Sequence, residues 1–237
     1  MTALKENLDR LEEAIAAACR AANRARAEVE LMAVSKTFPA EAVVEALSLN
    51  LALFGENRVQ EFTAKSHELG DARPRLRCHL IGHLQSNKSA RAAELFDGVD
   101  SLDSLRLAER LSEAAGKCAK RLPVLLEIKL SHEATKTGLD PASADAAQLL
   151  ERLPDLPQLE LHGLMTVAPL GAGEQGTRDC FRALRALRDR WAAAYSRLNF
   201  AVLSMGMSGD FPLAIAEGAT RIRVGSALFG SRPALRP

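Results

Sequence analysis

Short apolar segments alternate with amphipathic segments along the whole chain, and this alternation restricts the fold more than any other feature. Eight segments are typical of buried strands: 29–35, 51–55, 77–82, 98–102, 124–130, 159–167, 201–205 and 222–229. One helical pattern separates each strand from the next, at 39–49, 58–69, 88–96, 104–120, 142–153, 177–196 and 211–217. Strands that alternate with single helices are expected to run parallel, because each helix carries the chain back to the start of the next strand.

Eight such units favour a closed (β/α)₈ barrel over an open sheet. The chain has 237 residues, close to the roughly 250 residues that are typical of this barrel. We therefore expect a single α/β domain over residues 1–237. An additional amphipathic helix is predicted at 4–24, and no helix is predicted after the last strand. The count of elements suggests that the N-terminal helix covers the gap.

Composition and charge exclude several classes of protein. The formal net charge is only +1 and aromatic residues make up 4%, so neither a basic footprint nor a base-stacking platform for nucleic acid is expected. No apolar run approaches a membrane span, and the first 26 residues do not form a signal peptide. The four cysteines are scattered without metal spacing. We expect a cytoplasmic protein with reduced thiols that binds neither metal, membrane nor nucleic acid.

Polar residues follow the predicted strands, where a barrel carries its functional groups. Lys36 is the most informative, because it follows the apolar run Leu31–Ser35 at the end of the first strand. Desolvation there can lower a lysine pKa, and a neutral amine can form a Schiff base with an aldehyde. The alternative is a lysine whose ammonium group extends from the strand end into solvent.

Two glycine- and serine-containing segments lie at the last two strands. Residues 204–210 read Ser-Met-Gly-Met-Ser-Gly-Asp, and residues 223–226 read Arg-Val-Gly-Ser. Loops after strands seven and eight form the usual phosphate site of these barrels, where glycines let backbone N–H groups approach the phosphate. The alternative is that Ser208 or Asp210 only caps the next helix. A literal G-x-G-x-x-G at 171–176 does not follow its strand directly, so we expect a flexible loop there and no dinucleotide site.

Several motifs resemble the YggS/PROSC family of pyridoxal phosphate (PLP) homeostasis proteins. They are Ala-Val-Ser-Lys-Thr at 33–37, Phe-Gly-Glu-Asn-Arg-Val-Gln-Glu at 54–61, and His-Leu-Ile-Gly-His-Leu-Gln-Ser-Asn-Lys at 79–88. Gly-Leu-Met at 163–165, Ser-Met-Gly-Met-Ser at 204–208 and Arg-Val-Gly-Ser-Ala-Leu-Phe-Gly at 223–230 continue the match in the same order. Several motifs of this length together are far more specific than any one of them alone.

The resemblance implies a fold, a cofactor and a set of cofactor-binding residues. The fold would be a lone barrel of the alanine racemase N-terminal domain type (PLP fold type III), without a C-terminal β-domain. Lys36 would carry PLP as an internal aldimine, Arg223 would face the pyridine nitrogen, and Asn57 would line the pocket. The phosphate would be held by Ser208, Gly225 and Ser226, and the predicted cofactor-binding set also includes His83 and Met207.

The resemblance also implies a role in PLP supply and in amino-acid and keto-acid balance, without established catalytic turnover. Arg223 would leave the pyridine nitrogen unprotonated, which weakens carbanion stabilisation. Racemisation needs a second acid or base, and the only tyrosine, Tyr195, lies on a long predicted helix away from the strand ends. We expect a monomeric carrier that delivers PLP to apo-enzymes. The alternatives are a weak PLP-dependent racemase using His83 or Lys136 and, more distantly, a Schiff-base aldolase.

Overall fold

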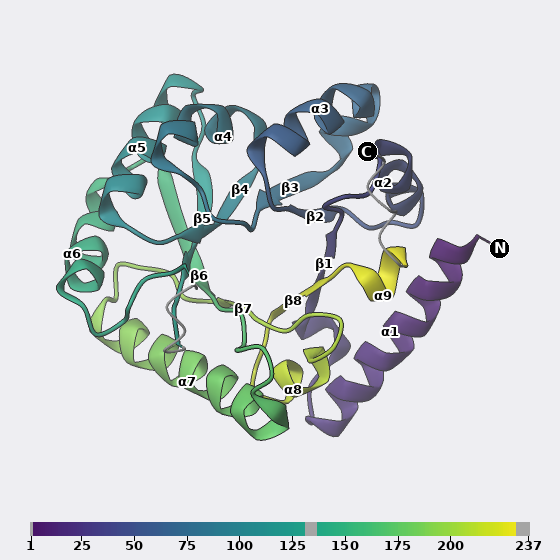
Figure 1. The fold of residues 1–237 in the computed structure, drawn as a ribbon. Helices are drawn as coiled ribbons and strands as arrows, with labels where there is room; N and C mark the ends of the chain where they lie inside the picture. The colour runs from purple at the N-terminus through teal and green to yellow at the C-terminus, as the bar shows by residue number, and fades with distance from the viewer. Residues whose placement is uncertain (1, 131–136, 231–237) are drawn as a thin grey trace.

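Eight parallel strands close into a barrel in the order β1 to β8, with β8 paired to β1. The computed structural model describes residues 2–130 and 137–230. The strands are β1 (Glu30–Val34), β2 (Leu53–Glu56), β3 (Arg77–Leu80), β4 (Gly98–Leu102), β5 (Leu122–Glu127), β6 (Leu159–Met165), β7 (Val202–Ser204) and β8 (Arg221–Val224). Figure 1 shows the strands at the centre, surrounded by the helices. The predicted fold class is confirmed.

The helices on the outside of the barrel follow the predicted order. They are α1 (Ala3–Ala21), α2 (Ala40–Ser48), α3 (Val59–Leu69), α4 (Ser89–Leu95), α5 (Leu105–Lys117), α6 (Ala144–Arg152), α7 (Gly173–Ala194), α8 (Phe211–Ala216) and α9 (Ser226–Phe229). Short 3-10 turns span Arg26–Glu28, Gly70–Arg75, Ser86–Lys88 and Leu153–Asp155. Hydroxyl groups of Thr2, Ser104 and Ser143 accept N–H bonds at the starts of α1, α5 and α6, which fixes where these helices begin.

Two element predictions are wrong. The last strand ends at Val224, and Ser226–Phe229 forms the short helix α9 because the Gly225 carbonyl oxygen accepts N–H bonds from Leu228 and Phe229. The segment 171–176 is not a loop throughout, since α7 begins at Gly173. The N-terminal helix does cover the gap beside the last strand: α1 packs against α8 and α9 (Figure 1). The Asn7 side chain donates a hydrogen bond of 2.9 Å to the Leu228 carbonyl oxygen.

Apolar side chains fill two regions, one between the strands and the helices and the other inside the barrel. Buried residues of the outer region form one continuous cluster that includes Leu11, Phe62 and Phe181. Met32 is fully buried inside the barrel and fills space that Gly55 leaves open, because a Cβ at Gly55 would lie 2.8 Å from the Met32 sulfur. Among the described residues, no helix is both long and apolar enough to cross a membrane.

Candidate functional site

A cavity of about 180 Å³ opens at the carboxyl ends of the strands. It is lined by Val34, Lys36, Phe38, Ile81, Met207, Ser208, Arg223, Gly225 and Ser226. Six of the eight predicted cofactor-binding residues are in this set: Lys36, Met207, Ser208, Arg223, Gly225 and Ser226. Residues far apart in the sequence thus surround one space because β1, β7 and β8 are neighbours in the closed barrel.

Asn57 and His83, the other two predicted residues, lie beside this cavity. Both line a shallow hollow between the loops that follow β2 and β3. The His83 side chain is 48% exposed, and its Nδ1 atom lies 3.2 Å from Oδ2 of Asp103. The structure therefore places both residues at the rim. Lys136, the other basic residue considered for a racemase, lies outside the described residues.

Arg223 is a buried cation at the cavity. Its Nη1 donates to the carbonyl oxygen and hydroxyl of Ser204 at 2.7 and 2.8 Å, and its Nη2 donates to the Thr166 carbonyl oxygen at 2.8 Å. All three acceptors are neutral, and Arg223 has no ion pair with a carboxylate in the described part of the chain. Burial lowers the pKa of the guanidinium, while the charge of Asp100 opposes this shift. An arginine has five N–H donors, and the described residues accept bonds from three of them.

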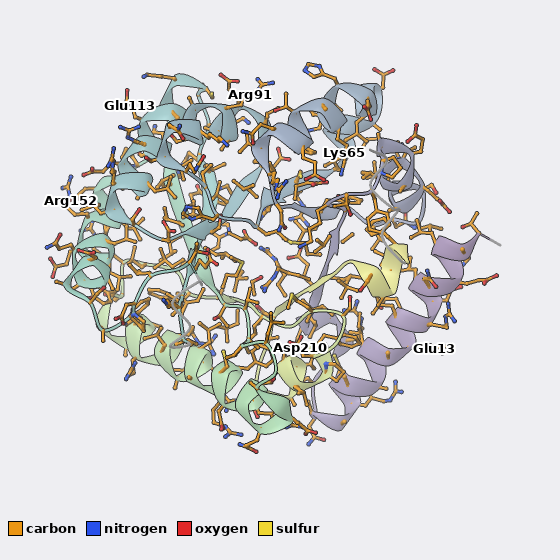
Figure 2. The ribbon with its side chains drawn as sticks, in the orientation of Figure 1. Glu13, Lys65, Arg91, Glu113, Arg152 and Asp210 are labelled. Atoms are coloured by element: carbon orange, nitrogen blue, oxygen red, sulfur yellow. The ribbon has the colours of Figure 1, made fainter. Side chains whose placement is uncertain are left out.

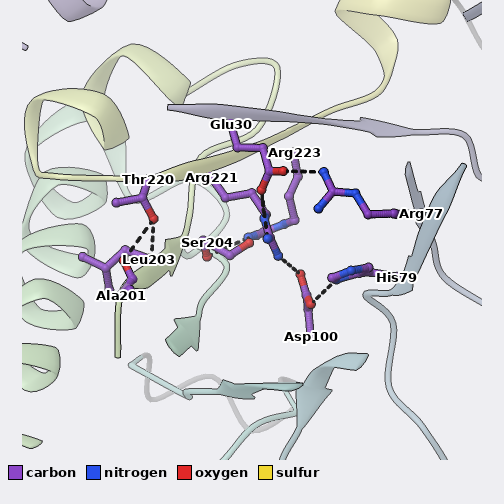
Figure 3. Close-up of polar contacts among 10 residues, drawn as sticks. All are labelled: Glu30, Arg77, His79, Asp100, Ala201, Leu203, Ser204, Thr220, Arg221 and Arg223. Carbon is purple, nitrogen blue, oxygen red and sulfur yellow. Dashed lines mark hydrogen bonds and ion pairs between the residues drawn. The ribbon is translucent and has the colours of Figure 1, made fainter. Parts of the chain in front are cut away.

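A chain of ion pairs lies deeper in the barrel (Figure 3). Asp100 is fully buried; its Oδ1 lies 2.8 Å from Nδ1 of His79, and its Oδ2 accepts a 3.1 Å bond from Arg221. Arg221 also pairs with Glu30, which in turn pairs with Arg77 at the amino-terminal end of the barrel. Burial acts to raise the pKa of Asp100, but His79, Arg221 and Arg223 hold that pKa below its usual value. The carboxylate therefore stays charged beneath Arg223.

The loop after β7 meets the start of α9 at the cavity. Gly206 has a φ of +93°, and a Cβ there would lie 2.6 Å from the Cβ of Ala214, so the turn requires glycine. The Asp210 carboxylate accepts the Met207 N–H, which closes the loop on itself. The Ser208 hydroxyl accepts the Ala227 N–H at 3.3 Å. Ser208 therefore contacts the first turn of α9, not the next helix. Neither Ser208 nor Asp210 caps α8 with its side chain, so the capping alternative is wrong in the form predicted.

The end of β1, which precedes Lys36, is fixed by side chains from β2 and α3. Lys65 donates to the Ser35 carbonyl oxygen at 2.8 Å and forms a buried ion pair with Glu56, whose Oε1 also accepts the Ser35 hydroxyl. The Glu61 carboxylate accepts the Thr37 N–H at 2.7 Å. Thr37 has a φ of +67°, an uncommon and strained conformation for a β-branched residue. These contacts therefore fix the backbone on both sides of Lys36.

Glu127 is a titratable residue near the cavity that the sequence analysis did not single out. It ends β5, and its Oε1 accepts a 3.3 Å bond from the Thr137 hydroxyl. Its Oε2 is buried and has no hydrogen-bond partner among the described residues. Burial raises the pKa of Glu127, and the charge of Asp103 adds to the effect. The sequence signal available was a carboxylate within the predicted apolar strand 124–130.

A second cavity lies at the opposite end of the barrel. It has a volume of about 370 Å³ and is lined by residues that precede or begin β5, β6 and β7, among them Arg121, Glu160 and Asn199. Arg121 and Glu160 pair with each other at 3.0 Å across it. In this class of barrel the amino-terminal end contributes to stability, while functional groups lie at the carboxyl ends of the strands. The smaller cavity beside Lys36 is therefore the candidate site.

Comparison with known proteins identifies the family. The family model described as alanine racemase, N-terminal domain, matches residues 4–233. A protein of Pseudomonas aeruginosa named "Pyridoxal phosphate homeostasis protein" is 42% identical over 232 residues, which covers 98% of this chain and 97% of that protein. The protein of the same name from Escherichia coli K12 is 39% identical over 236 residues and 98% of each chain.

Solved structures agree. The structure of PipY from Synechococcus elongatus with PLP bound has a TM-score of 0.80 and 46% identity, covering 86% of this chain and 93% of PipY. An alanine racemase of Clostridium difficile shares the fold alone, with a TM-score of 0.71 and 18% identity, and this chain spans 57% of it. The chain thus belongs to the family of pyridoxal phosphate homeostasis proteins, which is built on the barrel of the alanine racemase N-terminal domain.

Proposed function

We propose that this protein binds PLP in the cavity beside Lys36, holds it as a Schiff base, and releases it to apo-enzymes. The observation that carries the proposal is the composition of that one cavity. It combines a primary amine, a buried guanidinium with donors to spare, and a loop region with two serine hydroxyls. These groups match the aldehyde, the pyridine nitrogen and the phosphate of PLP.

The residues of the cavity fit each part of the cofactor. Bound PLP would supply an aldehyde that condenses with an amine and loses water. Lys36 is the amine at the cavity, and Ser208, Gly225 and Ser226 would receive the phosphate at the loop end. At Gly225, a Cβ would lie only 3.1 Å from the Val34 carbonyl oxygen, so this position keeps the backbone close to β1.

Arg223 favours storage over turnover. A guanidinium remains protonated at neutral pH and can only donate hydrogen bonds, so a pyridine nitrogen facing it would accept a bond and stay unprotonated. An unprotonated ring withdraws electrons less strongly from a bound amino acid. Tyr195 follows α7 at the amino-terminal end of the barrel, where it cannot serve as an acid or base at the cavity.

The first experiment compares PLP with pyridoxal, which has no phosphate, in absorbance titrations of the purified protein. We expect wild type to bind PLP more tightly, and Ser226→Ala to weaken PLP binding by roughly tenfold, the effect of one lost hydrogen bond to a charged group. Pyridoxal binding is expected to stay the same in Ser226→Ala. The exposed Ser48→Ala is the matched control. Equal affinity of wild type for the two compounds would contradict the proposed phosphate site.

Release is tested with the loaded protein, an apo-aminotransferase, and a phosphatase that destroys free PLP. Direct delivery predicts that aminotransferase activity returns at a rate that the phosphatase does not change. If the phosphatase abolishes the recovery, PLP reaches the acceptor only through solution, and the delivery part of the proposal is wrong.

A racemase is the second candidate, and Glu127 is the observation that favours it. This carboxyl group ends β5, the strand opposite β1 in the order of the barrel, and burial raises its pKa. A carboxyl group across the site from Lys36 could exchange a proton with a substrate as an acid or base. Exchange of the α-proton of an amino acid with deuterated solvent, lost in Glu127→Gln, would support this candidate. Absence of exchange in wild type would exclude it.

A further inference from the structure

A larger cleft adjoins the candidate cofactor cavity. It has a volume of about 860 Å³ and is lined by Lys36, Thr37, Asn57, Arg58, Gln60, Glu61 and Lys88. Lys36 lines both the cleft and the cofactor cavity. A molecule in the cleft therefore reaches the same amine that PLP would modify.

The cleft lies between the loops that follow β2 and β3. Asn57, Arg58, Gln60 and Lys88 also line the neighbouring hollow of about 250 Å³ that contains His83. The two loops meet at Gly82, where a Cβ would overlap the Asn57 carbonyl oxygen. The long motifs at 54–61 and 79–88 thus form one wall, most of which the cofactor cavity does not use.

The charges of the cleft are unbalanced. Three of the described lining residues are basic, Lys36, Arg58 and Lys88, and Glu61 is the one carboxylate among them. Glu61 already accepts the Thr37 N–H at 2.7 Å. Arg58 and Lys88 form no ion pair with any carboxylate in residues 2–130 and 137–230, whereas Arg91, close by on α4, pairs with Glu94 at 2.8 Å. The cleft therefore offers two cationic side chains to an anion.

We propose that this cleft binds the carboxylate of an α-amino acid, with Arg58 and Lys88 as the residues that hold it. The inference rests on the proposed function, because it requires PLP to be linked to Lys36. Only a ligand with a primary amine can exchange with that linkage, and only an anionic group uses the two cations. An amino acid carries both groups on one carbon.

The exchange balances without a further reactant. The neutral amine of the amino acid attacks the carbon that links PLP to Lys36, and a new carbon–nitrogen bond forms. The bond to Lys36 Nζ then breaks, and both protons of the incoming amine pass to Nζ, which leaves as a neutral primary amine. Nothing is oxidised or reduced. The carboxylate bound at Arg58 and Lys88 holds the amine near Lys36, which lowers the entropic cost of the exchange.

The test compares L-alanine with ethylamine, which is alanine without its carboxylate. The full-length protein is loaded with PLP, titrated with each amine and reduced with borohydride. Peptide mass then gives the fraction of Lys36 that still carries the label, and hence an apparent exchange constant for each amine. The measured quantity is the ratio of the alanine constant to the ethylamine constant within each variant, so a general change in PLP affinity cancels.

We expect wild type to favour alanine, and Arg58→Gln and Lys88→Gln each to reduce that preference by about tenfold, as for the loss of a charge-assisted hydrogen bond. Arg58→Lys should retain part of the preference for alanine, because the positive charge remains. The exposed Lys117→Gln on α5, whose side chain pairs with Glu113, should match wild type.

Two results would overturn the inference, and they are distinguishable. If the ratio is the same in wild type, Arg58→Gln and Lys88→Gln while PLP alone labels Lys36, the carboxylate subsite is wrong and the proposed function stands. If PLP does not label Lys36 in wild type, the proposed function fails and this inference fails with it.

Discussion

The buried pair of Lys65 and Glu56 gives the sharpest prediction about how the fold supports Lys36. Figure 2 shows Lys65 on the inner side of α3, and its side chain is only 6% exposed, while that of Glu56 is 0% exposed. Lys65→Met removes the ammonium group but keeps an apolar chain of similar length. The Glu56 carboxylate would then be buried without a cation. Removing one partner of a buried pair typically costs about 3–5 kcal/mol.

The loss of stability can also be calculated independently from the ordinary pKa of Glu56. Without Lys65, the least costly state of Glu56 is the neutral acid. Its ordinary pKa is 4.5, so holding it protonated at pH 7 costs about 3.4 kcal/mol, at 1.36 kcal/mol per pH unit. Even in the native protein, burial raises the pKa of Glu56 against the opposing effect of Lys65. We therefore expect Lys65→Met to lower the free energy of unfolding by about 3–4 kcal/mol at pH 7.

The pH dependence has a definite sign. A carboxyl group with a raised pKa in the folded state contributes its full stability below its unfolded pKa and loses it as the pH rises through the folded pKa. Stability of Lys65→Met should therefore fall by up to about 1.4 kcal/mol per pH unit from pH 5 upward. Urea unfolding at pH 5, 6, 7 and 8 measures this slope. The double variant Glu56→Gln/Lys65→Met should not show this pH slope, because it has no carboxyl group at position 56. The control Lys117→Met, at an exposed position, should change stability by less than about 1 kcal/mol. A loss below about 1 kcal/mol in Lys65→Met, with no pH slope, would refute the reasoning.

Three other predictions concern single residues elsewhere in the barrel and its loops. Glu127→Gln should gain stability relative to wild type as the pH rises from 4.5, because burial raises the Glu127 pKa and ionisation then destabilises only wild type; equal urea-unfolding profiles from pH 4 to 8 would contradict this. Gly206→Ala should lower the melting temperature, since φ is +93° and the new Cβ would meet Ala214; an unchanged transition in calorimetry would count against a strained turn. Gly98→Ala should also destabilise, because its Cβ would lie 2.6 Å from the His79 ring; retained stability would mean that the ring can move without breaking its bond to Asp100.

Periodicity predicted the barrel, because a parallel strand buried on both faces produces a continuous apolar run that differs from an amphipathic helix. It failed at the last strand: Ala227, Leu228 and Phe229 are as apolar as a strand but form a helical turn after Gly225. The start of α7 was also missed, since the glycines at 171 and 173 are typical of loops. Both glycines have positive φ, and the helix begins at the second of them.

The candidate site was predictable to the extent that strand order places residues at one end of the barrel. Lys36, Ser208 and Arg223 follow or end neighbouring strands and do meet at one cavity. Asn57 and His83 line the neighbouring hollow instead. This could not be predicted, because the sequence does not give the direction of a side chain in a loop.

Contacts between distant segments could not be predicted at all. The Lys65 ammonium reaches back to the Ser35 carbonyl oxygen, 30 residues earlier, and no local pattern marks that bond. The same holds for Arg221 and Asp100, which are 121 residues apart and meet only when the barrel closes. Such contacts depend on the closed arrangement of the strands and not on the properties of either segment.

The central claim is that Lys36 holds PLP, and one measurement tests it most directly. The purified protein is incubated with PLP, its visible absorption is recorded before and after borohydride, and the modified peptide is identified by mass. The account predicts a visible band that reduction removes, a PLP label on Lys36, and neither band nor label at that position in Lys36→Ala. A wild-type protein that stays colourless with PLP, or carries its label on another lysine, would contradict the account.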